Sequence, residues 1–594
     1  MSVDSVSQSG PSIGSAYTAG RALITARTHC ASTGHFLATQ AAFQILEAGG
    51  NAIDAGVGAA LVLAVVHSDQ VNLAGVAPMI IHLAERQEMV TIDGLGVWPA
   101  AASCELFETR HAGRIPEGLL RTIVPAAPAA HIEALRRFGT MSFGQCASFA
   151  ERFAREGFVM YPFMHEQLQL VRPKLERWPS NTEVYLPGGE VPAVGELFVQ
   201  PDLAASLRYM MDEERAALAR GADRRGGLQA ARDAFYRGDL GRAITRFQAE
   251  NGGLLTMDDL ARFEVRLEQP VCSRFGELDV HACGFWCQGP TLGQALNILK
   301  KLPLAEMGHN SVDYVHHVAE ALKLVFSDRE AHYGDPAFLE SPLDWLLSES
   351  HADERRQLIR ADRAWPGLPP PGQATTASAA PQAAPPAGQR DARGEPEGPF
   401  DTSCVTVVDR HGNAICIAPS DVCSDTMVVP GTGLAPSSRG SQSWASRAHP
   451  SSVAAGKRPR LTPSPAMLSQ PGKLLMPIGS PGGDSQTQAN VQVILNMFVF
   501  GMDAQTAVEQ PRFITYSHPD SFSPHLAFPG RLCLEGRFPA ANAQGLSERG
   551  HEVVVWPQRL WRAGGVCTIR LDRETGILSA GADPRRAAAS AVGW

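Results

Sequence analysis

The sequence predicts a protein of mixed helices and strands, the α+β class, and three segments carry that prediction. Residues 39–66 place apolar side chains at helical spacing on both sides of a GGN turn, which predicts two packed helices. Residues 311–336 predict another helix, with an apolar face, most charges on the other face and a Gly and Pro at its end. Residues 404–418 predict a hairpin, because a mostly β-branched run, a DRHGN turn and a second apolar run follow one another.

The composition describes an ordinary globular chain. Of 594 residues, 44% are apolar and 19% charged, which is enough to bury a sizeable core and unlike a disordered or membrane protein. The net charge of −9, with no basic run longer than KRPR, argues against a nucleic-acid partner and favours a small molecule. The first thirty residues lack the basic start and apolar run of a secretory signal, so we expect a cytoplasmic protein. The eleven cysteines show no framework spacing and are expected to be mostly buried thiols.

A change of composition divides the chain into three parts. Residues 365–401 are rich in Pro, Ala, Gly and Gln and nearly free of large apolar side chains, so we expect a mobile tether there. The predicted hairpin starts almost where this tether ends. We therefore expect one part at 1–364, the tether at 365–401 and a second part at 402–594.

The end of the tether carries three consecutive potential nucleophiles, Thr402, Ser403 and Cys404. If the bond between Asp401 and Thr402 is cut, Thr402 gains an α-amino group of pKa about 8 beside its own hydroxyl. Nucleophile and base then lie in one residue, and the same hydroxyl could first attack the Asp401 carbonyl to cut the chain. The alternative is an ordinary strand that is rich in hydroxyl residues.

A second feature is the paired glycine of the segment PIGSPGGDSQ, Gly482 and Gly483. Successive glycines in a tight turn can aim their N–H groups at one point, and such a turn stabilises the oxyanion formed when an acyl carbonyl is attacked. A plain turn is the alternative, since glycine pairs are common.

Taken together, these segments resemble the γ-glutamyltranspeptidase family of N-terminal-nucleophile hydrolases. The resemblance covers most of the chain. The matching blocks, in order, are ATQAAFQILEAGGNAIDAG, NGGLLTMDDLARFEV, EALKLVFSDREAHYGDPAF, TSCVTVVDRHGNAI, VVPGTG, KRPR, GSPGG and ADPRRAA. The resemblance implies a four-layer αββα sandwich that is built from both chains of a self-cleaved precursor, residues 1–401 and 402–594, with no cofactor.

The resemblance also implies roles for individual residues. Thr402 matches the family's nucleophile, which becomes the N-terminus of the small chain, so Asp401 and Thr402 flank the cleavage point. Ser420 stands where the family has a threonine whose hydroxyl contacts the nucleophile. Thr462 stands at the second of two substrate-contacting serines, with Leu461 at the first. Gly482 and Gly483 match the oxyanion-hole glycines.

The expected substrate-recognition residues are altered. The position of the family's carboxylate-binding arginine is Leu95, which offers no guanidinium. The block that carries an acidic residue in the family reads SSRGSQSW, without a carboxylate, and introduces Arg439 together with Ser441 and Gln442. Arg439 is therefore a candidate cation for an acidic substrate, with a surface arginine as the alternative. The glycine-rich turn after the first helices also departs, reading NLAGVAPM, and Cys404 replaces a histidine.

The prediction is a self-processing amidohydrolase or acyltransferase in which Thr402 attacks an amide and water or an amine resolves the acyl-enzyme. The substrate is a γ-glutamyl compound such as glutathione or, alternatively, another acidic amide of the oxamate or glutaryl type. An uncleaved binding or scaffold homologue is the non-enzymatic alternative, and pairs of cleaved chains could associate as a dimer. A thiol nucleophile at Cys404 would lack the free amine. We expect no metal, because His316, His317 and Glu320 lack a second imidazole one helical turn away and Cys272, Cys283 and Cys287 lack paired CxxC spacing.

Overall fold

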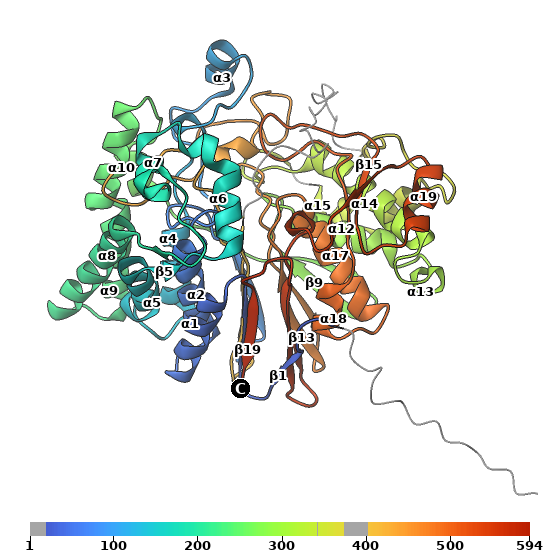
Figure 1. Ribbon diagram of the computed structural model, residues 1–594, viewed down its shortest axis with the longest axis horizontal. Coiled ribbons are helices and arrows are strands. Elements are labelled where there is room, and N and C mark those ends of the chain that lie inside the picture. Colours follow the sequence, from blue (N-terminus) through green and yellow to red (C-terminus); the bar gives the residue numbers. More distant parts are fainter. Residues whose placement is uncertain (1–18, 341, 374–401) are drawn as a thin grey trace, which may run out of the picture.

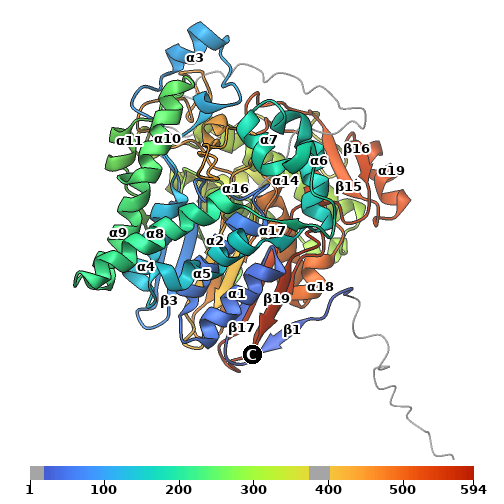
Figure 2. The same cartoon turned by 60° about the vertical axis from the view of Figure 1, so that its left-hand side comes forward.

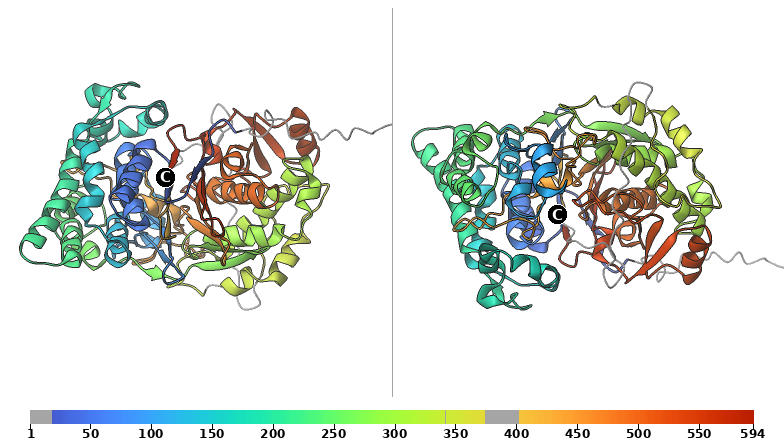
Figure 3. Two further views of the ribbon diagram at one scale, coloured as in Figure 1. Left: turned by 90° about the horizontal axis from the view of Figure 1, so that it is seen from below. Right: turned by 90° about the horizontal axis from the view of Figure 1, so that it is seen from above.

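Two seven-stranded sheets pack face to face in the computed structural model, which describes residues 19–340, 342–373 and 402–594, and helices cover the outer face of each sheet (Figure 1). The views from below and above show the four layers side by side (Figure 3). The predicted four-layer αββα sandwich is therefore confirmed.

The first sheet carries the predicted hairpin near its centre. Its strands, in spatial order, are β19 (Ser590–Gly593), β2 (Cys30–Thr33), β10 (Val405–Val408), β11 (Ala414–Ile417), β3 (Met79–Leu83), β4 (Glu88–Ile92) and β7 (Leu267–Glu268). Neighbouring strands run antiparallel, and β10 pairs with β11 from Val405 opposite Ile417 to Val408 opposite Ala414. Strands from the two sides of residue 401 thus share one sheet, so the predicted cleavage point is not a boundary between folding units.

The second sheet is also antiparallel and also mixes segments from both parts of the chain. Its strands, in spatial order, are β1 (Ile24–Ala26), β18 (Leu578–Ala582), β17 (Cys567–Asp572), β13 (Leu474–Gly479), β12 (Ala466–Gln470), β9 (Leu278–Ala282) and β8 (Val271–Phe275). A layer of small apolar side chains fills the space between the sheets, and Cys404, Cys416 and Cys567 lie in it.

The two helices predicted in residues 39–66 are present as α1 (Phe36–Glu47) and α2 (Ala52–Val66). Asn51 caps α2, and the Asp54 carboxylate accepts the Asn51 N–H, which completes a capping box. Every residue of α2 is buried, because the helix lies between the first sheet and its outer helices. The outer helices are α4 (Ala127–Phe138), α5 (Phe143–Glu156), α8 (Pro201–Ala219), α9 (Arg224–Tyr236) and α10 (Asp239–Glu250); several of them are visible in Figure 2.

The helix predicted in residues 311–336 is α14 (Val312–His332), and Ser311 caps it. Its charged face is buried as well as its apolar face, because acidic and basic partners from other elements surround it; Arg329, for example, pairs with Asp484. The other helices of this side are α12 (Gly289–Leu299), α13 (Leu304–Met307), α15 (Leu343–Leu346), α16 (Glu349–Arg356), α17 (Ser485–Phe498), α18 (Ala504–Glu509) and α19 (Ala540–Glu548).

Smaller elements complete the fold. They are a sheet of β14 (Phe513–Thr515), β15 (Arg531–Glu535) and β16 (Glu552–Trp556), the pair β5 (Phe158–Val159) and β6 (Leu197–Phe198), helices α3 (Cys104–His111), α6 (Pro162–Leu175), α7 (Pro179–Tyr185) and α11 (Met257–Arg262), and the 3₁₀ turns η1 (Leu119–Arg121), η2 (Pro187–Gly189), η3 (Arg439–Gln442) and η4 (Trp561–Ala563). Within the described ranges, every helix is too short or too polar to span a bilayer.

The start of the predicted tether differs from the prediction. Residues 365–373 lie against α14 and α16, where Ser327 donates to the carbonyl of Pro369 at 2.6 Å and Arg355 donates to that of Pro370 at 2.8 Å. Prolines remove backbone donors but leave carbonyls, and here buried polar side chains use those carbonyls. The remainder of the predicted tether, up to Asp401, lies outside the described residues.

Candidate active site

Thr402 lies just before β10, separated from it by Ser403 and Cys404, and is completely buried. Its φ of 91° lies in the left-handed region, which is a strained conformation for a β-branched residue. Strain of this kind costs on the order of 1–3 kcal/mol and is held in place only by surrounding contacts. Because φ is defined by the carbonyl carbon of the preceding residue, cutting the bond to Asp401 would remove this strain.

The Thr402 hydroxyl contacts the side chains of Ser420 and Gln486. Its Oγ1 lies 2.6 Å from Oγ of Ser420, and Nε2 of Gln486 donates to it at 3.3 Å. Arg439 donates from Nη2 to Oγ of Ser420 at 2.6 Å. Because a guanidinium can only donate, Ser420 accepts from Arg439, and either hydroxyl can donate in the contact between Ser420 and Thr402. The side chains of Ser420 and Gln486 therefore lie against the oxygen that would carry negative charge during an attack.

The backbone of Thr402 is held from the other part of the chain. Its N–H donates to the carbonyl of Gln70 at 3.3 Å, and the N–H of Asp421 donates to the same carbonyl at 3.1 Å. Arg586 donates to the Gln70 side chain at 2.7 Å and so fixes that residue. The sequence analysis did not single out Gln70 or Arg586, although Arg586 belongs to the ADPRRAA block.

The glycine pair forms the predicted tight turn between β13 and α17. Gly482 and Gly483 have φ values of 121° and 55°, which favour glycine. Within the described residues, neither backbone N–H has a hydrogen-bond acceptor. Gln486, in the first turn of α17, contacts Thr402, so the turn lies beside the nucleophile. Backbone N–H groups of this kind, next to a hydroxyl nucleophile, are suited to form an oxyanion hole.

The altered segment NLAGVAPM contacts Ser420 directly. Val76 and Ser420 exchange backbone hydrogen bonds of 3.1 and 2.9 Å. A Cβ on Gly75 would lie 2.3 Å from the carbonyl oxygen of Ser420, so this close approach requires a glycine. The single remaining glycine thus suffices to place Ser420 against Thr402.

Arg439 is completely buried in η3, which rules out the alternative of a surface arginine. Burial lowers its pKa to about 9. The carboxylate of Asp421 lies 3.7 Å from its Nε, and the Phe522 ring lies 5.3 Å from its guanidinium carbon. The block 437–444 has no acidic residue of its own, but Asp421 supplies a carboxylate from outside the block. Its proximity to Ser420 in the sequence was the available signal.

Asp421 is held by the serines of that block. Ser437 and Ser438 donate through their hydroxyls, and the backbone N–H of Ser438 donates at 3.0 Å. Burial nevertheless raises the pKa of Asp421 to about 7. Asp421 also has a φ of 137°, a second strained position beside the nucleophile.

The remaining predicted substrate residues form a second group. Gln442 donates to Oγ1 of Thr462 at 2.8 Å, and the Thr462 N–H donates back to Gln442 at 3.3 Å. The hydroxyl of Ser441 has no hydrogen-bond partner in the described part of the chain. The N–H of Ser464 donates to Gln486 at 3.3 Å, which links this group to Thr402. Gln486 is a contact that sequence reasoning missed, although it is the last residue of the quoted PIGSPGGDSQ segment.

Two other positions have apolar surroundings. Leu95 is fully buried with Val76 and Trp98 and offers no charge to a substrate. Cys404 points into the layer between the sheets, where burial raises its pKa well above the ordinary thiol value. A thiol that stays protonated is a poor nucleophile, so Cys404 is not a competitor of Thr402.

Comparisons with known proteins agree with this geometry. Residues 38–593 match the family described as gamma-glutamyltranspeptidase. The chain is 32% identical over 563 residues to the acylase ACY 1 proenzyme of a Pseudomonas species, covering 90% of this chain and 88% of that one. It is 29% identical to a glutathione hydrolase-like proenzyme of Bacillus subtilis, covering 93% and 96% of the two chains.

A solved structure, that of cephalosporin acylase from Bacillus halodurans, superposes with a TM-score of 0.82 at 26% identity and covers 100% of this chain and 99% of that one. The family match includes most strands of both sheets and the residues around Thr402. The chain therefore belongs to the gamma-glutamyltranspeptidase family of self-processing amidohydrolases.

Proposed function

We propose that Thr402 is the nucleophile of an N-terminal-threonine amidohydrolase and that it also cuts the chain at Asp401–Thr402. The observation that carries the proposal is the chain of contacts from Arg439 through Ser420 to Oγ1 of Thr402, beside the Gly482–Gly483 turn. In the first reaction, Oγ1 attacks the Asp401 carbonyl, the amide becomes an ester and water opens it. The strain at Thr402 favours this step, because the product no longer contains the strained peptide unit.

The liberated amine then serves as the base. The carbonyl of Gln70, which accepts the Thr402 N–H, orients the new amine through one N–H and leaves its lone pair to take the hydroxyl proton. The substrate carbonyl is attacked by Oγ1, its oxygen receives the N–H groups of Gly482 and Gly483, and the amine proton goes to the leaving group. Water resolves the acyl-enzyme, and an acceptor amine in its place would give transfer.

We propose that the acyl group is acidic and is bound by Arg439. A carboxylate of the substrate would lie against a buried guanidinium, which forms strong charge-assisted hydrogen bonds. Leu95 offers no cation, so a free α-carboxylate of the γ-glutamyl type depends on Arg439 as well. The Asp421 carboxylate is held by hydrogen bonds from Ser437 and Ser438. A second carboxylate, that of a dicarboxylic monoamide of the glutaryl or oxamate type, would then bind Arg439.

The test is the Thr402→Ala substitution. We expect the variant to remain one chain and to lose at least about 10³-fold in hydrolysis of glutaryl, oxamate and γ-glutamyl amides, because nucleophile and base are both removed. Denaturing electrophoresis and mass spectrometry measure the cleavage, and amine or ammonia release measures the activity. Full cleavage or activity in this variant would place the nucleophile elsewhere.

Ser403→Ala is the matched control. Its hydroxyl lies next in the chain but contacts Nδ1 of His67 at 3.3 Å rather than the Thr402–Ser420 pair. We expect Ser403→Ala to mature and to retain activity within a few-fold. Equal losses in both variants would indicate damage to the strand end instead of loss of a nucleophile.

A further inference from the structure

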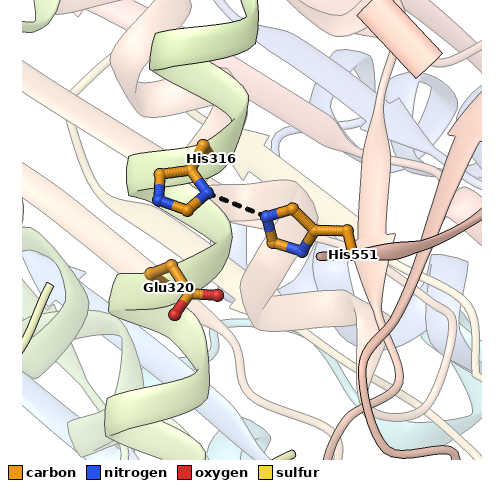
Figure 4. Close-up of side chains that lie close together, drawn as sticks. All are labelled: His316, Glu320 and His551. Carbon is orange, nitrogen blue, oxygen red and sulfur yellow. Dashed lines mark hydrogen bonds between the residues drawn. The ribbon is translucent and has the colours of Figure 1, made fainter. Parts of the chain in front are cut away.

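A polar cluster of three buried side chains lies in the helical layer of the second sheet and shares no residue with the site around Thr402. His316 and Glu320 project from α14, and His551 directly precedes β16 (Figure 4). One ligand-type atom from each of them lies within 4.8 Å of the others. Sequence reasoning set His316 and Glu320 aside because a second imidazole was missing from the helix. The fold supplies it from a position more than two hundred residues along the chain.

The geometry of this cluster follows from simple elements. His316 and Glu320 are four residues apart on one helix, so their side chains share a face. His551 follows a tight turn at Gly550, with a φ of 90°, and its N–H donates to the carbonyl of Leu546 at the end of α19. The two rings face one another, with Nδ1 of His316 at 2.9 Å from Nε2 of His551.

The hydrogen bonds of His316 fix its tautomer. Its Nε2 lies 2.7 Å from the carbonyl oxygen of Arg360, which can only accept. Nε2 therefore carries the proton, and Nδ1 presents a lone pair toward His551. Metal-binding histidines are oriented in the same way, by donating their second ring N–H to a carbonyl or carboxylate.

The cluster leaves polar capacity unused. Within the described residues, Nδ1 of His551 and Oε1 of Glu320 have no hydrogen bond, although Nζ of Lys323 lies 2.7 Å from Oε1 as an ion pair. Oε2 of Glu320 accepts the N–H of Trp365 at 2.9 Å. The 2.9 Å contact between Nδ1 of His316 and Nε2 of His551 requires one of the two ring nitrogens to accept, so a lone pair lies at the centre of the cluster. Neutral imidazoles are the protonation state that metals bind.

We propose that Nδ1 of His316, Nε2 of His551 and the carboxylate of Glu320 form a zinc site. Two imidazoles and one carboxylate, with a fourth position for water, are a ligand set that Zn²⁺ accepts at roughly 2.0–2.2 Å. The two ring nitrogens then move apart to roughly 3.3 Å, the separation expected for ligands at these distances in tetrahedral geometry. The proton on Nε2 of His551 moves to Nδ1, the ring atom that has no hydrogen bond now.

The site would join the two chains of the mature protein. His316 and Glu320 precede residue 401 and His551 follows it, so a bound metal links the segments on both sides of the proposed cleavage point. This consequence depends on the proposed self-cleavage, whereas metal binding itself does not. Zinc would then stabilise the cleaved pair of chains against separation.

Lys323 gives the site a distinctive property. Its ammonium lies 2.7 Å from Oε1 of Glu320, so it competes with a divalent cation for the same carboxylate. Removing this charge leaves Glu320 buried without a cation, which zinc can replace. We therefore expect Lys323→Met to bind Zn²⁺ more tightly than the natural sequence, by about tenfold or more, a response that an ordinary structural polar cluster would not give.

The experiment uses chelator-treated Thr402→Ala protein, which stays one chain if the proposed function holds, alongside the natural chain. Calorimetric titration with Zn²⁺ should give one site per polypeptide or chain pair, and Co²⁺ should give the visible absorption of a four-coordinate ion. His551→Gln and His316→Gln should each weaken binding at least tenfold. His317→Gln is the matched control, since that residue is only partly buried and its ring bonds the carbonyl of Asp313 at 2.8 Å. Circular dichroism establishes that each variant is folded.

Absence of stoichiometric Zn²⁺ binding, or binding that the His551→Gln variant retains in full, would overturn the proposal. So would weaker binding by the folded Lys323→Met variant. A second measurement separates the two proposals: in cleaved protein, zinc should raise the urea concentration at which the chains separate. If Thr402→Ala abolishes neither cleavage nor activity but zinc still binds through His551, the proposed function fails and the metal site stands.

Discussion

Two buried charge clusters lie near the Gly482–Gly483 turn, and they are built on different principles. In the first, Arg439 pairs with Asp421 and contacts Thr402 through Ser420. In the second, Asp484, which directly follows the glycines, pairs with Arg329. Both clusters are almost fully buried, so the amount of solvent does not distinguish them.

The difference lies in how well charge is matched. Burial lowers the pKa of Arg439 to about 9 and raises that of Asp421 to about 7. Burial also opposes charge at Arg329 and Asp484, yet their pairing raises the pKa of the arginine and lowers that of the aspartate. At similar burial, the pKa values of the two Arg–Asp pairs are shifted in opposite directions. Because perturbed pKa values are concentrated at functional sites, this contrast indicates different roles.

Backbone strain follows the same division. Thr402 and Asp421 are non-glycine residues with positive φ, whereas Arg329 lies in the regular helix α14. The Arg329–Asp484 pair, with matched charges and regular backbone at Arg329, stabilises the fold. At Thr402 and Asp421, by contrast, a reaction or a bound ligand can relieve backbone strain or the cost of a buried charge. The difference therefore indicates a chemical role for the Arg439–Asp421 cluster and a stabilising role for the Arg329–Asp484 cluster.

The largest expected effect concerns the turn itself. Gly482→Ala should lower kcat about 10²–10³-fold, because the strained backbone at a φ of 121° would turn the N–H donors away from the developing oxyanion. An added Cβ would also lie 2.5 Å from Oγ of Ser485. Steady-state kinetics on a glutaryl amide measures the loss.

Gly472→Ala is the control for that substitution. Gly472 has a φ of 71° in the turn between β12 and β13, and a Cβ there meets nothing within 4 Å. It carries a similar backbone penalty at the other end of β13, so activity should stay within a few-fold. Similar losses for Gly472 and Gly482 would remove the oxyanion role from the comparison.

The next effect separates the two arginines. Arg439→Met should lower kcat/KM for acidic amides about 10–100-fold more than for matched neutral amides, because a charge-assisted hydrogen bond contributes about 1.5–3 kcal/mol. Arg329→Met should leave that selectivity unchanged and lower the free energy of unfolding by about 3–5 kcal/mol, since it leaves buried carboxylates without their cation. Kinetics with paired substrates and urea unfolding measure the two outcomes.

An Arg439→Met variant that loses activity equally on both substrate classes would restrict Arg439 to positioning Ser420. An Arg329→Met variant that remains as stable as the natural chain would contradict the assignment of the second cluster to stability. Either result would break the division between the clusters.

The local parts of the fold and site could be predicted from the sequence. Helices α1, α2 and α14 and the β10–β11 hairpin follow from periodicity and turn residues, and Gly482–Gly483 takes the tight conformation that its sequence requires. The contact between Arg439 and Asp421 was not predicted, although Asp421 directly follows Ser420, which the sequence analysis singled out.

Contacts that depend on the packing of distant elements could not be predicted. Gln70 lies in the turn after α2 and Arg586 in the loop between β18 and β19, and no local pattern marks the contact between these distant segments. Periodicity placed most charges of α14 on the face opposite the apolar one, but it does not reveal that further elements cover that polar face. The same limit applied to His551, whose partners lie on a helix in the other part of the chain.

The smallest effect tests the comparison through pH. The pKa of Asp421 is raised to about 7 in the folded protein from an ordinary value near 3.8. Between these values the folded protein holds a proton that the unfolded chain has released, so this residue lowers the free energy of unfolding as the pH rises. Asp421→Asn should therefore gain stability relative to the natural chain between pH 5.5 and 7, by about 1–2 kcal/mol at 1.36 kcal/mol per pH unit.

Asp484→Asn is the matched control for this titration. The pKa of Asp484 is lowered, because Arg329 and His518 lie beside its carboxylate and outweigh burial. Its contribution is lost only as the pH falls below 3.8, so the stability difference caused by Asp484→Asn should stay constant between pH 5.5 and 7. Urea unfolding at the two pH values measures both differences. A constant difference for Asp421→Asn would mean that Arg439, 3.7 Å away, keeps Asp421 ionised, and both clusters would then be matched ion pairs.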